Sequence, residues 1–220
     1  MGVKRTRFIG PGGIGLLSAL LLVLGAVGLV GGVAYWVNGL TQAGAAVTVP
    51  VHLLPGASSQ VEAADPDRVA VPVAGLPAGA RVTADTGELG LTAWGSTIPE
   101  YALARADTLL LGLAVAFAGY LLVPLLRSVQ EGHPFADGNA RRVAGLAVAL
   151  LAAGWLGPFL TGLGSLLVLR RIGLDGADSG LEPATTSNLG LLLLGAALLA
   201  VLAEAFRRGE QISDDVDGLV

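Results

Sequence analysis

Apolar positions gather in four long runs, and more polar segments separate these runs. The runs extend from Ile14 to Trp36, from Thr108 to Leu126, from Val143 to Leu169 and from Ser187 to Ala203, and none of them contains a charged residue. About 20 apolar residues are needed for a helix to cross the hydrocarbon core of a bilayer. We therefore predict that each run forms a membrane-spanning helix.

Two of the runs depart from the ideal length. The third is longer than a bilayer requires and contains Pro158, which predicts a kink or an interfacial extension. The fourth is short for a span, so a spanning helix here must include flanking residues at both ends. In the first run, Gly28 and Gly32 form a G-x-x-x-G step, which favours close helix packing within the chain or in a dimer.

The polar segment between the first two runs has the alternation of strands. Four stretches are extended candidates: 47–51, 69–73, 80–84 and 89–94. Proline inside a strand removes a ladder donor, so these strands are expected at sheet edges or bulges. Trp94 and Tyr101, close to the second run, are expected to be interfacial anchors. This segment is either a simple β-rich cap or a surface that senses a ligand or partner.

The positive residues predict the orientation of the helices. Eight of the thirteen Lys and Arg residues lie before the first run, between the second and third, or after the fourth. Because positive loops stay in the cytoplasm, both chain ends are predicted inside and the β-rich segment outside. The first run is too long for a typical cleaved signal peptide. The Ala-, Gly- and Arg-rich composition favours a GC-rich bacterial genome, and hence the bacterial plasma membrane.

The expected architecture is an all-α membrane protein, a four-transmembrane-helix bundle with a small extracytoplasmic β-rich cap between helices one and two. Residues 1–37 hold the cytoplasmic N-terminus and the first helix, and residues 38–104 hold the cap. Residues 105–207 hold helices two to four, with a cytoplasmic loop at 127–142 and an outer loop at 170–186. Residues 208–220 form an acidic cytoplasmic tail.

Composition argues against most chemistry. The chain has no cysteine, two histidines without spaced partners, and a net charge of -4. The spans contain no ionisable residue, and no phosphate loop or nucleophile motif occurs. We therefore predict no catalytic residue, no cofactor and no metal site, and no direct binding of nucleic acid, which requires a clustered basic face. The lipid bilayer is the one partner predicted from composition, and the oligomeric state stays open.

The two segments after the second and fourth runs carry the candidate docking residues. In the loop, Phe135 is expected to pack as an apolar staple ahead of a helix capped at Ala136 or Asp137. The tail changes from basic to acidic, and its acids either pair with loop arginines or stay solvated. The candidate cytoplasmic face consists of Pro134, Phe135, Asn139, Arg141, Arg142, Glu204, Phe206, Arg207 and Gly209.

These two segments resemble those of domain of unknown function 2975, an uncharacterised family of bacterial four-span proteins. Gly132, Pro134, Phe135, Asn139 and Arg142 match its G-x-P-F-x-x-x-N-x-x-R signature. A second set matches its E-x-F-R-x-G segment and hydrophobic end: Glu204, Phe206, Arg207, Gly209, Leu219 and Val220. The chain departs from the family at Ala136, where a Thr or Ser cap is common, and at Asp137-Gly138, where two acids are common. The resemblance implies no known activity, but it implies a neighbouring gene for a helix-turn-helix regulator.

Two functions are compatible with this sequence. The first is a non-enzymatic membrane regulator or sensor that works with a helix-turn-helix transcription regulator. The alternative is a transport or lipid-handling component of a larger complex. That alternative requires a polar cavity between the helices, lined by Ser, Thr or Asn together with Glu204 or Asp107.

Overall fold

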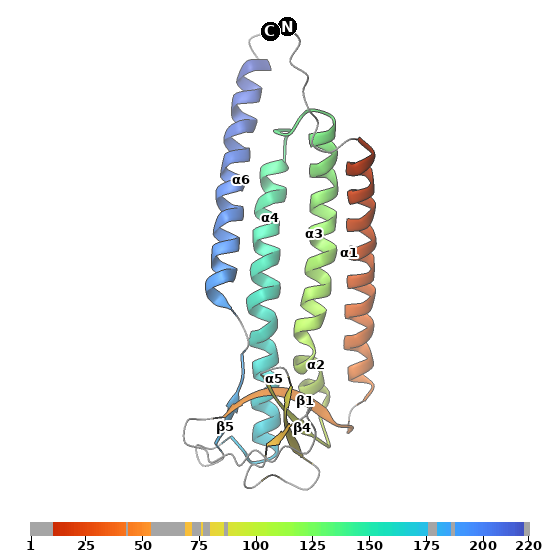
Figure 1. Ribbon diagram of the computed structural model, residues 1–220, viewed down its shortest axis with the longest axis vertical. Helices are drawn as coiled ribbons and strands as arrows, with labels where there is room; N and C mark the ends of the chain where they lie inside the picture. Colours follow the sequence, from red (N-terminus) through yellow and green to blue (C-terminus); the bar gives the residue numbers. More distant parts are fainter. Residues whose placement is uncertain are drawn as a thin grey trace. The chain divides into compact units, whose positions relative to one another are not determined.

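The protein was analysed as a computed structural model, which describes residues 11–42, 44–53, 69–71, 76, 80–85, 88–175, 180–185 and 188–217. Figure 1 shows its helices and strands. The helices are α1 (Pro11–Leu40), α2 (Ile98–Ala104), α3 (Ala106–Gln130), α4 (Asn139–Leu151), α5 (Gly157–Arg171) and α6 (Leu189–Asp217), with a π-helical turn, η1 (Ala152–Leu156), between α4 and α5. The strands are β1 (Val47–Leu53), β2 (Val69–Val71), β3 (Arg81–Asp85), β4 (Glu88–Ala93) and β5 (Leu181–Pro183).

Among the described residues, four helices are long and apolar enough to cross a membrane. They are Gly12–Leu40, Ala106–Gln130, Asn139–Arg171 and Leu189–Ser213. The prediction of four helices of this kind is therefore confirmed. Large apolar side chains such as Leu16, Leu111 and Leu191 are exposed on three of these helices, as expected for surfaces that face lipid.

The chain divides into two compact units. One comprises Met1–Gly31, Leu111–Ala152 and Asn188–Val220, and we call it the helical unit. The other comprises Gly32–Leu110 and Ala153–Ser187, and we call it the sheet unit. Each is described by itself.

In the sheet unit, five antiparallel strands lie in the order β2-β3-β4-β1-β5. The four predicted strands are present, and the small sheet is confirmed. Alternation buries Val47, Val49 and Val51 of β1, and these side chains pack with Leu91 and with Leu169 at the end of α5. In Figure 1 the strands gather around α2 and α5. The end of the predicted third span is thus part of this core.

Pro50 lies in an interior strand, so the expected edge position is wrong for β1. β1 pairs with β4 along Val47–Val51 and with β5 from Val51 to Leu53. The Pro50 carbonyl accepts the N–H of Ala184, just past the end of β5. The N–H that proline lacks would point to the same side as that carbonyl. Because pairing with β5 stops there, little is lost.

Two further features of the sheet unit differ from the sequence-based expectation. β5 belongs to the predicted outer loop 170–186, so the sheet draws on both segments predicted to lie outside and not on 38–104 alone. Tyr101 is 1% exposed, and its hydroxyl donates to the carbonyl of Ala46 at 2.6 Å. It is therefore a core residue and not an interfacial anchor, whereas Trp94 is 61% exposed. Positions 72 and 73 of the second extended candidate lie outside the described residues.

The helix of the third predicted span contains a local irregularity at the place where Pro158 suggested one. η1 ends at Leu156, and Pro158 follows in the first turn of α5. Proline has no N–H to donate and its ring crowds the preceding turn, so the wider π turn accommodates it. The helix resumes as α5 and continues to Arg171.

In the helical unit, α1 and α3 approach closely at glycines. A Cβ built at Gly25 would lie 3.2 Å from the Cα of Ala116, and one at Gly119 would lie 2.9 Å from the carbonyl oxygen of Leu21. A Cβ at Gly28 would lie 3.5 Å from the Val115 side chain. Small residues here allow the two backbones to meet, so Gly28 serves packing within the chain.

The last helix is longer than predicted. The sequence-based span ends at Ala203, but α6 continues without a break to Asp217. Within this extension, the Glu204 carboxylate pairs with Arg207 three residues later and with Arg208 four residues later. Such pairs lie on one helix face and favour the helix. The part of the acidic tail that the structure describes is therefore helical.

Candidate functional site

The loop before α4 and the second half of α6 come together in the helical unit. The rings of Phe135 and Phe206 lie 5.7 Å apart between centroids, with 59° between their planes. A Cβ at Gly209 would overlap the Phe135 ring, so only glycine leaves room for it. We call Phe135, Asn139, Phe206, Gly209 and Glu210 the loop–α6 cluster. Two segments that the sequence singled out separately thus form one structure.

Phe135, predicted as an apolar staple ahead of α4, lies against α6. Its ring is close to Phe206 and Gly209 of that helix. It stays 45% exposed. Phe135 therefore contacts α6 and remains accessible at the surface.

Asn139 is the central polar residue of the cluster and is fully buried. Its Nδ2 donates to the hydroxyl of Ser128 at 2.7 Å and to the carbonyl of Pro134 at 2.9 Å. Its Oδ1 accepts a hydrogen bond from Nη1 of Arg142 at 2.6 Å. A buried amide is stable only when its donors and acceptors have partners, and these contacts connect α3, the loop and α4.

The first turn of α4 is capped by a side chain from α6. The residue before the helix is Gly138, with φ of 85°, so the predicted cap at Ala136 or Asp137 is wrong. Glycine adopts this left-handed conformation readily, but it offers no side-chain acceptor. Oε1 of Glu210 accepts the N–H of Ala140 at 2.9 Å instead. A carboxylate at a helix N-terminus accepts a hydrogen bond from an N–H that has no partner within the helix. Its negative charge also interacts favourably with the positive end of the helix dipole.

The other candidate residues divide into paired and free groups. The Glu204 carboxylate accepts hydrogen bonds from Arg207 and Arg208 within α6, at 2.7 and 2.8 Å. The expected pairing of tail acids with Arg127, Arg141 or Arg142 is not among the contacts of the described residues, and Glu210 caps α4 instead. Arg141 is exposed, and its side chain makes no hydrogen bond or ion pair with any other described residue. It is the candidate docking residue most available to a partner.

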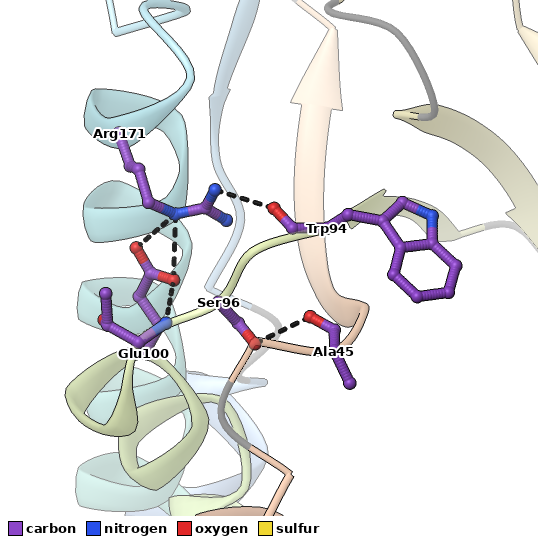
Figure 2. A network of polar contacts seen from close by, with 6 residues as sticks. Ala45, Trp94, Ser96, Glu100 and Arg171 are labelled. Atoms are coloured by element: carbon purple, nitrogen blue, oxygen red, sulfur yellow. Dashed lines mark hydrogen bonds and ion pairs between the residues drawn. The ribbon is translucent and has the colours of Figure 1, made fainter.

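A second polar network fixes the sheet unit (Figure 2). Nε of Arg171, at the end of α5, lies 2.8 Å from Oε1 and 3.1 Å from Oε2 of Glu100. Nη1 of Arg171 donates to the carbonyl of Trp94 at 2.8 Å, and Oε2 of Glu100 accepts the N–H of Thr97 at 2.9 Å. The Glu100 side chain is 3% exposed. Buried charges of this kind require partners, and here the partners join α2, α5 and the turn after β4.

Ser96 also fixes the turn after β4. Its hydroxyl donates to the carbonyl of Ala45 at 2.8 Å, and its carbonyl accepts the N–H of Gly44 at 2.8 Å. In Figure 2 the Trp94 ring points away from the Arg171 side chain. The turn is therefore fixed while the Trp94 ring is exposed.

Sequence reasoning missed the residues that carry these networks. Glu100 belongs to the predicted cap 38–104 and Arg171 to the predicted outer loop 170–186, and neither was a candidate site residue. Glu210 was counted only as part of the tail. Their partners lie 71 and 70 residues away in the chain, so no local spacing marks them. The one available signal was an acid at the third position of α2, which is typical of a capping box.

No chemistry follows directly from these arrangements. Within the described ranges, no three His, Asp or Glu side chains gather as metal ligands. Asp107, which the transport alternative requires, accepts the N–H and hydroxyl of Thr108 at the start of α3. Glu204 is occupied by its two arginines. The loop–α6 cluster is best suited to hold a surface in a fixed shape.

No protein-family model, curated protein or solved structure matches this chain. The resemblance to domain of unknown function 2975, together with the activity and partners it implies, therefore stays a prediction.

We expect Asn139→Ala to lower the free energy of unfolding by about 2 kcal/mol, because the change leaves the Arg142 donor and the Ser128 hydroxyl without their buried partner. Urea or thermal unfolding of the detergent-solubilised protein measures this difference. Asp137→Ala is the matched control, since Asp137 is exposed two residues away and is expected to change stability by less than about 0.5 kcal/mol. Equal effects of the two changes would contradict the role given to Asn139.

Proposed function

We propose that this chain is a multi-pass protein of the bacterial plasma membrane that acts as a non-enzymatic regulator or sensor. In this proposal both chain ends are cytoplasmic, and the sheet unit carries the extracytoplasmic cap. The surface around the loop–α6 cluster is the docking face for a cytoplasmic helix-turn-helix transcription regulator.

The observation that carries the proposal is the convergence of two distant segments. Phe135 and Asn139 belong to the loop and start of α4, whereas Phe206, Gly209 and Glu210 belong to α6. A buried asparagine, a glycine that makes room for a ring and a carboxylate that caps another helix all fix the shape of one surface. A docking face requires such preorganisation, because ordering a surface on binding reduces affinity.

The charge on this surface gives the expected chemistry of the partner. Arg141 is exposed and has no acidic partner among the described residues, and Phe135, just before α4, is also exposed. Aromatic residues and arginine are both enriched at protein interfaces. The partner surface is expected to be acidic with an apolar centre, which is distinct from the basic face that the regulator uses for DNA.

Arg141→Glu is expected to abolish co-purification of the full-length protein with the helix-turn-helix regulator encoded beside its gene. Reversal of an interfacial charge places like charges together and costs several kcal/mol, so capture from native membranes is expected to fall by at least about tenfold. Arg142 is a poor choice for this test, because its guanidinium bonds to Asn139 and its replacement would disturb the cluster.

The matched control is Arg170→Glu, which reverses an exposed arginine of the sheet unit. It is expected to leave capture unchanged. Capture that survives Arg141→Glu, or that falls equally with Arg170→Glu, would contradict the proposed face.

A further inference from the structure

Arg105 is a cation held at a place where two candidate spans end. It is the one residue between α2 and α3, and the candidate span Ala106–Gln130 follows it directly. Its guanidinium lies against Tyr35 and Gly39, in the last turns of the candidate span Gly12–Leu40. All of these guanidinium contacts fall within the sheet unit.

The guanidinium is fixed on several sides. Its Cζ lies 4.3 Å from the ring centroid of Tyr35 and 5.3 Å from that of Tyr101. Nη1 donates to the carbonyl of Tyr35 at 2.9 Å. A Cβ at Gly39 would lie 2.9 Å from Cδ of Arg105, so the side chain occupies a slot that only glycine leaves open. Two rings and a backbone carbonyl thus hold the cation in place without neutralising it.

Arg105 differs in this respect from the arginines at the end of α5. Arg171 pairs with Glu100 at 2.8 Å, and Arg170 lies 3.8 Å from Asp175. No carboxylate of the described residues lies within ion-pair distance of Arg105, and its guanidinium makes the single hydrogen bond to Tyr35. Guanidinium has five N–H donors. A partly buried guanidinium with most donors free, at the end of two apolar helices, has donors left with which to bind an anion.

We infer that Arg105, with the rings of Tyr35 and Tyr101, forms a binding site for the phosphodiester of a membrane phospholipid. The planar guanidinium fork fits two phosphate oxygens, and charge-assisted hydrogen bonds of this type are among the strongest in proteins. Lipid phosphates lie at the level where spanning helices end. Tyr35 is 48% exposed, and tyrosine is typical of that level. The inference rests on the proposed membrane insertion but not on the proposed docking face.

The test is native mass spectrometry of the full-length protein in a maltoside detergent. Phosphatidylglycerol, an uncharged galactolipid and inorganic phosphate are each added as probes. The wild type is expected to retain phosphatidylglycerol about tenfold better than galactolipid, and Arg105→Gln is expected to lose this preference. Arg105→Lys keeps the charge without the fork and is expected to be intermediate. Arg170→Gln, which alters an exposed arginine, is expected to behave as the wild type.

Each outcome has one meaning. Equal retention of phosphatidylglycerol by wild type and Arg105→Gln would overturn the site, and so would a wild type that retains both lipids alike. If Arg105→Gln loses helical circular dichroism, the comparison of lipids on the wild type and on Arg105→Lys decides instead. Displacement of the bound lipid by millimolar inorganic phosphate would overturn a lipid site in favour of a free-phosphate site. A wild type that retains neither lipid would likewise overturn the lipid site, whereas membrane insertion is tested separately by the accessibility of introduced cysteines.

Discussion

Glu100→Gln is expected to lower the free energy of unfolding by about 3–5 kcal/mol, which is typical when one partner of a buried ion pair is removed. The Glu100 side chain is 3% exposed and the Arg171 side chain 25%. The amide has nearly the same shape as the carboxylate, so packing is retained while the charge is lost. The amide offers one oxygen acceptor where the carboxylate offers two, and its NH2 group would face Nε of Arg171 or the N–H of Thr97, so the two donors lose an acceptor and the Arg171 cation loses its counter-charge.

The loss is expected to appear in the sheet unit first. Glu100 also accepts the N–H of Thr97 at the start of α2 and orients the Arg171 side chain that bonds the Trp94 carbonyl, so its replacement weakens the turn that carries Trp94. Thermal unfolding in detergent, followed by tryptophan fluorescence, measures the change. Asp175→Asn is the matched control because the Arg170–Asp175 pair is exposed and 3.8 Å long. Exposed pairs contribute at most about 1 kcal/mol, and equal effects of the two changes would contradict the buried pair.

Gly119→Val is expected to destabilise the helical unit by about 3 kcal/mol, at the upper end of the usual cost of overpacking. A Cβ at Gly119 would lie 2.9 Å from the backbone carbonyl oxygen of Leu21. Because the obstacle is backbone and not a flexible side chain, α1 would have to move away from α3. Close approach of this kind is the main source of stability between helices in lipid.

The chain offers a matched control for this change in α1. A Cβ at Gly31 would have no neighbour within 4 Å, so Gly31→Val adds the same side chain without a clash. It is expected to change stability by less than about 1 kcal/mol. Unfolding of both variants by titration with a denaturing detergent measures the difference, and a Gly31→Val variant as unstable as Gly119→Val would contradict the α1–α3 packing.

Strongly periodic features were predictable from the sequence. Uncharged runs of about 20 residues mark spans because a helix needs about that many predominantly apolar residues to cross the hydrocarbon core. The alternation of Val47, Val49 and Val51 marks a half-buried strand, and all three side chains are buried. Pro158 marked the irregular turn because a missing N–H is a property of the residue itself.

Features that depend on tertiary partners were not predictable. β5 has three residues, too few for a pattern, and exists because it pairs with β1. Tyr101 has the composition of an interfacial anchor, but the carbonyl of Ala46 and the sheet core bury it. Of the candidate docking set, Phe135, Asn139, Phe206 and Gly209 come together, while Glu204 and Arg207 pair with each other. Glu210, which caps α4, was outside that set because its role depends on a helix 70 residues away.

The most direct test of the proposed function is to determine on which side of the membrane the sheet unit and the loop before α4 lie. The chain has no cysteine, so single cysteines can be introduced without background. His52 of the sheet unit and Asp137 of the loop before α4 are exposed. A membrane-impermeant maleimide is expected to label His52→Cys in intact, wall-stripped cells, and to label Asp137→Cys only after lysis. Labelling of Asp137→Cys before lysis, with His52→Cys protected, would contradict a cytoplasmic docking face on this protein.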